Sequence, residues 1–326
     1  MRALVCKELG PADKLVIETR PDPVASAGEV LVRVHAAGIN FPDLLVIQGL
    51  YQVKIEPPFI PGNEAAGVVL STGDGVTRYK TGDRVIIMPE GGGAFAELCV
   101  VPQERVIPML DQLDFEQAAG FTITYGTSYH ALKQSAKLQP GETVLVLGAA
   151  GGVGITAVEC AKAMGARVIA AASSEVKLEF ARSAGADETI NYSQESLRDR
   201  CKALTGGKGV DVVYDPVGGE LAQQALRALG WHGRYLVIGF ASGDIPNFPA
   251  NIALLKEASI IGVWWGTWLA NHPGEAEQNM QELFGMVVKG ILKPRVTETW
   301  PLDSYAEAFN SLSNRTARGK VILNFS

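Results

Sequence analysis

The segment Val144-Leu145-Val146-Leu147-Gly148-Ala149-Ala150-Gly151-Gly152-Val153-Gly154 decides the fold of this chain. Its apolar start predicts a buried strand, its glycines predict a tight turn, and the following residues 155–164 have a helical pattern. In such a turn the backbone N–H groups approach a pyrophosphate, and the helix N-terminus adds partial positive charge. We therefore predict a dinucleotide-binding turn rather than an ordinary strand-to-helix turn, with the phosphates near Ala150, Gly151, Gly152 and Val153.

Downstream of this turn, apolar strands alternate with helical segments. We expect strands at residues 143–147, 167–172, 210–215, 233–239 and 259–263. Strands that alternate with helices form a parallel sheet through right-handed crossovers. The predicted fold class is therefore α/β, with a Rossmann doubly wound parallel sheet spanning residues 122–264.

The sequence upstream of the turn has a different rhythm. From residue 1 to about 120 the apolar segments are short and are separated by Gly, Pro and Asp, which is typical of a mostly-β domain. Beyond Trp264 we expect a helix at 275–289, a strand near 296, a helix at 304–314 and a strand at 320–323. Because the nucleotide-binding sheet is already full, we predict a discontinuous mostly-β domain of residues 1–121 plus 265–326.

Composition excludes several classes of protein. The chain has 326 residues, 47% apolar and 20% charged, and a net charge of −6 without a basic run, which argues against a nucleic-acid surface. Its N-terminus lacks an apolar stretch, so we expect a cytoplasmic protein without a membrane anchor. The four cysteines contain no C-x-x-C pair, which argues against a zinc ribbon or a disulfide framework.

The end of the second predicted strand indicates which cofactor binds. Enzymes that use NAD usually place a carboxylate there to hold the ribose hydroxyls, and this chain has Ala172 instead. Ser173, Ser174 and Lys177 follow, and two hydroxyls with an ammonium suit a 2′-phosphate. Glu175 is discordant, although a residue in the first turn of a helix can point to solvent. We predict NADPH; the alternative is a serine that caps a helix beside a surface lysine.

Four motifs in order make the chain recognisable over nearly its whole length. It resembles the zinc-free quinone oxidoreductases of the medium-chain dehydrogenase/reductase superfamily, in which the mostly-β domain is GroES-like and catalytic. The matching motifs are Ala36-Ala37-Gly38-Ile39-Asn40-Phe41-Pro42-Asp43, Pro61-Gly62-Asn63-Glu64-Ala65-Ala66-Gly67, Thr127-Ser128-Tyr129-His130-Ala131-Leu132 and Ala149-Ala150-Gly151-Gly152-Val153-Gly154.

The resemblance implies that no metal is bound. The zinc alcohol dehydrogenases of the same superfamily have a cysteine where this chain has Asn40 and a histidine where it has Asn63. A catalytic zinc needs about three N, S or O ligands from the protein, and asparagines at these positions do not supply them. Without a Lewis acid, we expect reduction of an acceptor that is already electron-poor rather than oxidation of an alcohol.

By resemblance, Asn40, Asp43 and Tyr51 should line the cleft beside the nicotinamide, with Thr127 near its ring or ribose. Tyr51 is the candidate for holding the acceptor oxygen or passing it a proton, because a phenol both donates and accepts hydrogen bonds. Solvent is an alternative proton source. Asn40 and Asp43 have an alternative role as loop caps, and Tyr51 as a half-buried loop aromatic.

The resemblance also implies further cofactor contacts. Tyr192 resembles a tyrosine near the adenosine 2′-phosphate, or is simply a strand-end aromatic. The tryptophans at 264, 265 and 268 form either an acceptor wall or core. Lys320, with Arg318, either reaches a cofactor phosphate or lies on the surface. Together with the late-strand residues expected against the nicotinamide, the additional candidates are Tyr192, Gly239, Phe240, Val263, Trp265 and Lys320.

These observations predict hydride transfer from NADPH to a quinone. The alternative is an NADPH-dependent reductase of activated C=C bonds in enones, enals, acrylates or enoyl thioesters, and a more distant one is a nucleotide-binding protein without catalysis. The partner is then a small-molecule quinone or enone. By analogy with relatives, we expect a homodimer or homotetramer paired through the apolar segment 259–263.

Overall fold

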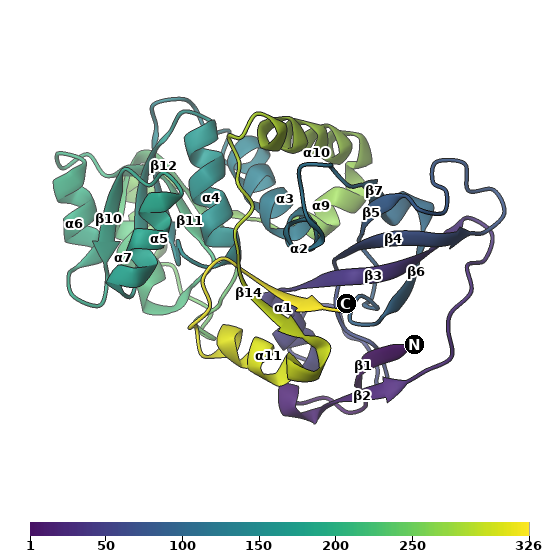
Figure 1. Cartoon of the computed structure of the whole chain (residues 1–326). Helices are drawn as coiled ribbons and strands as arrows, with labels where there is room; N and C mark the ends of the chain where they lie inside the picture. Colours follow the sequence, from purple (N-terminus) through teal and green to yellow (C-terminus); the bar gives the residue numbers. More distant parts are fainter. Residues whose placement is uncertain (326) are drawn as a thin grey trace. The chain divides into compact units, whose positions relative to one another are not determined.

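The structure is a computed structural model that describes residues 1–325, and the chain forms two compact units (Figure 1). One unit comprises residues 1–123 with the segment from 294 onward, and the other comprises residues 124–293. The first boundary lies close to the predicted one at 121. The second lies at 293 rather than 264, so residues 265–293 group with the nucleotide-binding unit.

The first unit is mostly β, as predicted. Its main sheet has the order β14-β15-β3-β4-β5-β7, with β6 also paired to β3, and β1 and β2 form a separate antiparallel pair. The strands are β1 (Arg2–Cys6), β2 (Leu15–Thr19), β3 (Glu29–Ile39), β4 (Ala65–Thr72), β5 (Arg84–Ile87), β6 (Leu98–Pro102), β7 (Val106–Pro108), β14 (Val296–Pro301) and β15 (Lys320–Asn324). The helices are α1 (Phe41–Ile47), α2 (Phe115–Ala119) and α11 (Tyr305–Ser313), with short 3₁₀ turns at Ala12–Lys14, Gln103–Arg105 and Leu302–Ser304.

Strand β3 organises this unit. Val30, Val32 and Val34 alternate toward the core while Arg33 is exposed, as expected for a strand with one covered face. The last four residues of β3 are all buried, so the strand delivers the next residue, Asn40, into the interior. The antiparallel partner β15 pairs its Val321 with Ile39 at this end. Residues 320 and 40 therefore lie side by side although they are far apart in sequence.

The second unit contains a parallel sheet with the order β10-β9-β8-β11-β12-β13. Its strands are β8 (Thr143–Leu147), β9 (Arg167–Ala172), β10 (Glu188–Asn191), β11 (Val210–Asp215), β12 (Leu229–Val237) and β13 (Ser259–Gly262). In chain order this is 3-2-1-4-5-6, the doubly wound Rossmann topology. The order reverses between β8 and β11, so the glycine turn after β8 lies at the switch point where ligands bind such sheets.

Helices precede, connect and follow these strands. They are α3 (Thr122–His130), continued by a π-helical turn (Ala131–Ser135), α4 (Gly152–Ala163), α5 (Glu175–Ser183), α6 (Leu197–Leu204), α7 (Gly219–Ala228), α8 (Ala250–Lys256), α9 (Trp265–Asn271) and α10 (Pro273–Val288). Helix α9 and strand β10 were not among the predicted elements. Helix α10 belongs to this unit because Glu282 accepts hydrogen bonds from Tyr129 of α3 and from Lys133, 2.6 Å away. This packing explains why the boundary falls after α10.

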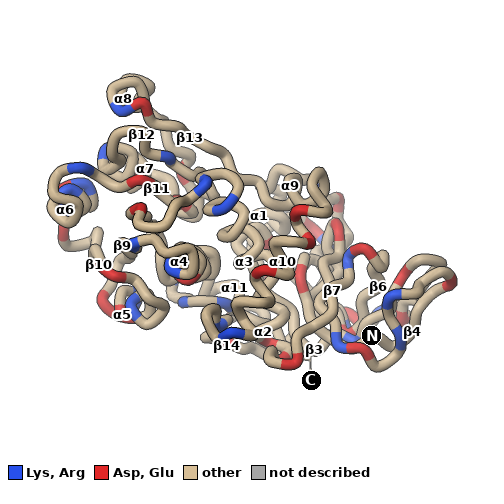
Figure 2. The backbone as a smooth tube through the Cα atoms, turned by 90° about the horizontal axis from the view of Figure 1, so that it is seen from above, with Lys and Arg blue, Asp and Glu red and all other residues tan. Residues whose placement is uncertain are grey.

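In the part of the chain that the structure describes, the charged residues form no single basic surface (Figure 2), and the cysteines form no disulfide. Figure 2 shows basic and acidic residues interspersed along both units, with several basic residues on α6. All four cysteines are free and buried. No helix among residues 1–325 is both long and apolar enough to cross a membrane.

Candidate functional site

The glycine turn has the close backbone packing that a pyrophosphate site requires. Gly148 has a φ of +55°, in the left-handed region that glycine adopts without strain. A Cβ on Gly154 would lie 2.2 Å from the carbonyl oxygen of Gly148, so only glycine fits there. Helix α4 begins at Gly152, and the first N–H groups of a helix have no acceptor within it. The turn can therefore offer backbone donors to an anion.

A buried hydroxyl network supports the start of α4. The Ser128 hydroxyl of α3 donates to the carbonyl oxygen of Val153 at 3.0 Å and lies 2.8 Å from the Thr156 hydroxyl and 3.0 Å from the Tyr214 hydroxyl. Thr127, predicted near the nicotinamide ring or ribose, is the half-buried residue before Ser128 on the same helix. The network ties α3 and β11 to the glycine turn.

The candidates for the 2′-phosphate gather at the carboxyl ends of β9 and β10. Lys177 Nζ lies 3.4 Å from the Ser173 hydroxyl, and the backbone N–H of Tyr192 donates to the carbonyl oxygen of Ala172 at 3.2 Å. Ser174 is the N-cap residue of α5. Glu175, the discordant acid, is exposed and forms an ion pair with Arg182 at 2.5 Å. The Glu175 carboxylate is therefore paired with a cation on its own helix.

A buried acid that sequence analysis missed lies across the switch point at the end of β11. Asp215 accepts hydrogen bonds from the backbone N–H groups of Val217 and Gly218 and from the Tyr235 hydroxyl at 2.5 Å. Burial raises the pKa of this carboxyl, and these hydrogen bonds partly oppose the rise. The signal for it was an acid that ends an apolar strand beside a glycine pair. Asp215 shapes the loop between β11 and α7.

The predicted contacts on the late strands stand at strand ends. Gly239 and Phe240 follow β12 closely, and Val263 follows β13 directly. The tryptophans differ from one another, since Trp264 is half exposed whereas Trp265 is buried. A Cβ on Gly126 would lie 2.4 Å from the Trp265 ring, so this indole packs on the backbone of α3. Trp265 is therefore part of the packed interior of its unit.

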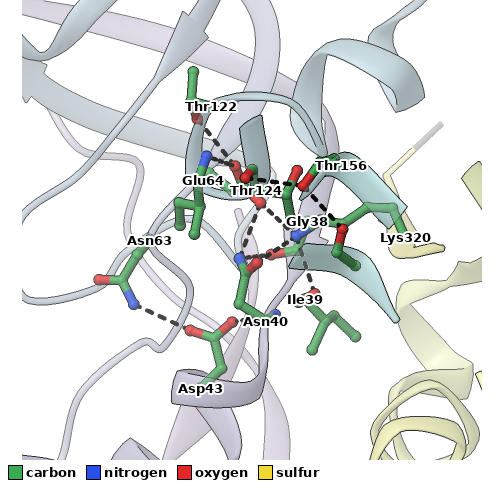
Figure 3. Close-up of polar contacts among 12 residues, drawn as sticks. Gly38, Ile39, Asn40, Asp43, Asn63, Glu64, Thr122, Thr124, Thr156 and Lys320 are labelled. Atoms are coloured by element: carbon green, nitrogen blue, oxygen red, sulfur yellow. Dashed lines mark hydrogen bonds and ion pairs between the residues drawn. The ribbon is translucent and has the colours of Figure 1, made fainter. Parts of the chain in front are cut away.

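In the first unit, Lys320 and Glu64 form a buried ion pair (Figure 3). Lys320 Nζ lies 2.5 Å from Glu64 Oε1, 2.5 Å from Asn40 Oδ1 and 3.1 Å from the carbonyl oxygen of Ile39. Three acceptors therefore match the three N–H bonds of the ammonium. Sequence analysis offered Lys320 as a cofactor-phosphate contact or a surface residue. The structure instead buries it, and a phosphate would have to displace an acceptor that it already has.

Glu64 is the hub of this network and was missed as a site residue. Its Oε1 also accepts from Asn40 Nδ2 at 2.9 Å, and its Oε2 accepts from the Thr122 hydroxyl at 2.9 Å and the Ile123 N–H at 3.0 Å. The available signal was an acid at the start of the apolar strand 65–70, because a buried carboxylate needs a cation and donors. The Asn40 amide is thereby engaged on both its oxygen and its nitrogen.

Asp43 and Asn63 form the second half of the network. Asp43 Oδ2 accepts from the backbone N–H of Asn40 at 2.7 Å, and Asp43 Oδ1 accepts from Asn63 Nδ2 at 3.0 Å. Burial raises the pKa of Asp43 to about 7, while the hydrogen bond from Asn40 and the charge of Lys320 oppose this rise. Tyr51 is half-buried in the loop after α1. The structure thus brings Asn40, Asp43 and Lys320 together.

The donor set does not fit a catalytic zinc. Among residues 1–325 there is no group of three or more His, Cys, Asp or Glu side chains that could hold a metal ion. Glu64 is already neutralised by Lys320, and the Asn63 amide nitrogen is engaged with Asp43. Neutral amides in these positions are weak zinc ligands compared with thiolate or imidazole.

Comparison with known families supports the same two-part organisation. The family model described as "Alcohol dehydrogenase GroES-like domain" matches residues 26–111, and the one described as "Zinc-binding dehydrogenase" matches residues 152–285. "Quinone oxidoreductase-like protein 2 homolog" of Nematostella vectensis is 41% identical over 326 residues, which cover 99% of this chain and 88% of that protein.

Two solved structures share the whole fold. Escherichia coli quinone oxidoreductase complexed with NADPH has a TM-score of 0.93 and 30% identity, and the match covers 100% of both chains. CurK enoyl reductase has a TM-score of 0.89 and 29% identity, and the match covers 100% of this chain and 99% of that one. Similarity therefore extends to proteins named for two different acceptors.

Proposed function

The chain belongs to the quinone oxidoreductase branch of the medium-chain dehydrogenase/reductase superfamily and is an oxidoreductase, and we propose that it reduces quinones with NADPH, without zinc. The observation that carries the cofactor part of this proposal is the end of β9, where Ala172 replaces the usual carboxylate and Lys177 Nζ lies 3.4 Å from the Ser173 hydroxyl. An ammonium beside a hydroxyl attracts a 2′-phosphate, whereas the ribose diol of NADH favours an acid.

The chain's own residues fit this cofactor at the carboxyl ends of the parallel strands. The N–H groups of Gly151, Gly152 and Val153 would hold the pyrophosphate at the start of α4, and Ala150 allows close approach. Ser173, Ser174, Lys177 and Tyr192 would hold the ribose phosphate. Thr127, Gly239, Phe240 and Val263 would lie toward the nicotinamide, which supplies a hydride when bound.

The residues of the first unit would act on the acceptor. Asn40 is fixed by Glu64 and Lys320, so we assign it a positioning role rather than proton transfer. Tyr51 would hold the acceptor oxygen, and Asp43 would set the polarity of the groups around Asn40. Zinc independence is supported by the asparagines at 40 and 63, because amides do not replace thiolate and imidazole ligands.

A specific observation also favours the reduction of activated C=C bonds as a second candidate. CurK enoyl reductase shares the fold at 29% identity. Both reactions place a negative charge on an acceptor oxygen after hydride addition, and they differ in the shape of the acceptor.

The deciding experiment follows NADPH oxidation with 1,4-benzoquinone, 9,10-phenanthrenequinone, a simple enone and crotonyl thioester, each repeated with NADH and with chelator. We expect NADPH-dependent quinone turnover that chelator does not change. Lys177→Ala should raise the KM for NADPH by about tenfold, the worth of one exposed charge–phosphate contact, and leave that for NADH unchanged. Turnover with the enone or thioester alone would favour the second candidate.

We also propose a homodimer formed through β13. This strand is the last of the six-stranded sheet, and Ile260 in it is exposed, as are Leu254 and Leu255 of the preceding helix. An exposed apolar edge strand favours pairing with a second copy. Light scattering would test it, with Ile260→Lys expected to give a monomer.

A further inference from the structure

The Asn63 side-chain amide has a defined orientation toward Asp43. Its nitrogen donates to Asp43 Oδ1 at 3.0 Å, and Figure 3 shows its oxygen pointing away from this carboxyl. Asn63 is half-buried whereas Asp43 is 1% exposed, so of these two side chains Asn63 is the one that keeps some exposure to a ligand. With the nitrogen facing Asp43, the atom of the amide that points away is Oδ1, a hydrogen-bond acceptor (Figure 3).

Which end of the Asn63 amide faces Asp43 depends on whether Asp43 is protonated. An ionised Asp43 only accepts, so it must face the nitrogen of Asn63. Asp43 Oδ2 is already held by the backbone N–H of Asn40, so an added proton would sit on Oδ1, which faces Asn63. That O–H would meet the N–H of Asn63, and the amide relieves the conflict by turning its oxygen inward. Its N–H₂ group then points outward.

We propose that Asn63 is a catalytic residue that donates a hydrogen bond to the acceptor oxygen, and that Asp43 is the positioning residue whose protonation turns the amide into this donor. This inference rests on the proposed function, because it assumes that the acceptor binds beside Asn63. It adds the group that stabilises charge on the substrate.

Reduction of the acceptor consumes no proton from Asp43. A quinone or enone that receives a hydride gains two electrons and one hydrogen, and the negative charge collects on its oxygen. An N–H donor aimed at this oxygen stabilises the transition state, whereas an amide oxygen would repel the charge. Water then supplies the proton, and the Asp43 proton stays in place.

The direction of the pH dependence follows from this geometry. The charged groups that act on Asp43 are Lys320 of β15, which favours its ionised form, and Glu64 at the start of β4, which opposes ionisation. With a pKa of about 7, Asp43 is protonated below neutrality, so the donor form predominates at about pH 6. We expect kcat to fall roughly fivefold between about pH 7 and about pH 8 as this proton is lost.

Asp43→Asn tests the switch directly. The oxygen of the introduced amide would accept from the Asn40 N–H, and the nitrogen of that amide would then hold the oxygen of Asn63 inward. This variant mimics protonated Asp43 permanently. We expect it to retain the kcat that the wild type has near pH 6 and to show no fall up to about pH 8.5, with a deuterium isotope effect confirming that hydride transfer limits the rate.

Two variants serve as comparisons. Asn63→Ala should lower kcat near pH 6 by about 10- to 100-fold and give a flat profile. Asp83→Asn removes the same charge from an exposed turn, where Asp83 accepts from the Lys80 N–H, and should keep the wild-type profile. The proposal is overturned if folded Asp43→Asn is inactive throughout, if it keeps the wild-type fall, or if Asn63→Ala keeps the wild-type pH profile.

A measurement without an acceptor separates this inference from the proposed function. The side-chain ¹H–¹⁵N signals of Asn63, assigned with Asn63→Ala, should titrate near pH 7 in the wild type and stay fixed in Asp43→Asn. Signals that do not titrate overturn the switch even where quinones are reduced. Titrating signals without turnover of any acceptor support the switch and count against the proposed function.

Discussion

The two sites of this molecule are built in opposite ways. The glycine turn of the second unit is a backbone structure made by one contiguous segment, residues 148–154, in which space for backbone atoms matters most. The network of the first unit consists of side chains from four separate segments that meet at Glu64. A backbone site tolerates change except where a Cβ has no room, whereas a side-chain network depends on each charge and donor in it.

The largest effect should come from breaking the ion pair of this network. Lys320→Met leaves the buried Glu64 carboxylate without its cation, and we expect a loss of about 3–5 kcal/mol in the free energy of unfolding. Urea denaturation followed by circular dichroism measures it. Adding Glu64→Gln should restore part of the loss, because a neutral side chain at 64 no longer leaves a buried charge without its cation. A loss below about 1 kcal/mol in Lys320→Met would contradict the buried pair.

A smaller effect is expected in the glycine turn from Gly154→Ala. The new methyl group meets the Gly148 carbonyl oxygen at 2.2 Å, and we expect a loss of about 1–3 kcal/mol in stability and at least about tenfold weaker NADPH binding. Fluorescence titration with NADPH measures the affinity. Gly285→Ala is the matched control in α10, because beyond the nearby backbone of that helix the new Cβ meets no atom within 4 Å, and it should bind NADPH as the wild type does. Equal affinity in both variants would show that the turn has room to spare.

The smallest effect should come from removing the Ser128 hydroxyl, which links helix α3 to the backbone at the start of α4. Ser128→Ala removes the donor to the Val153 carbonyl oxygen, and we expect a cost of about 1 kcal/mol and a few-fold weaker NADPH binding. Ser183→Ala, which removes an exposed hydroxyl on α5, should change neither quantity. If Ser128→Ala binds NADPH with wild-type affinity, the network supports α3 alone and not the turn.

The same contrast explains what the sequence could predict. The second unit was predictable because strands such as residues 143–147 and 167–172 are apolar and bounded by glycine turns, and their observed limits are the predicted ones. Strand β10 was missed because Glu188-Thr189-Ile190-Asn191 has a single buried apolar residue. Helix α9 was missed because it is only seven residues long, and it follows a strand without a capping signal.

The candidate site was predictable only in its local parts. Ser173 and Lys177 are four positions apart across the start of α5, so their proximity follows from sequence spacing. The approach of Lys320 to Asn40 depends on the register of β15 against β3, which joins residues 280 positions apart. No local pattern encodes that register. The burial that gives Asp43 its raised pKa likewise arises from tertiary packing.

The position of β15 between β14 and β3 has a consequence for biosynthesis. Residues 124–293 leave the ribosome as a complete segment, so the second unit can fold while the chain is still growing. The first unit must wait for β15, which lies between β14 and β3. Until Lys320 emerges, the Glu64 carboxylate lacks its cation and the edge of β3 is open to other strands. Chaperone binding to nascent chains should therefore persist on the N-terminal segment until β15 has left the ribosome.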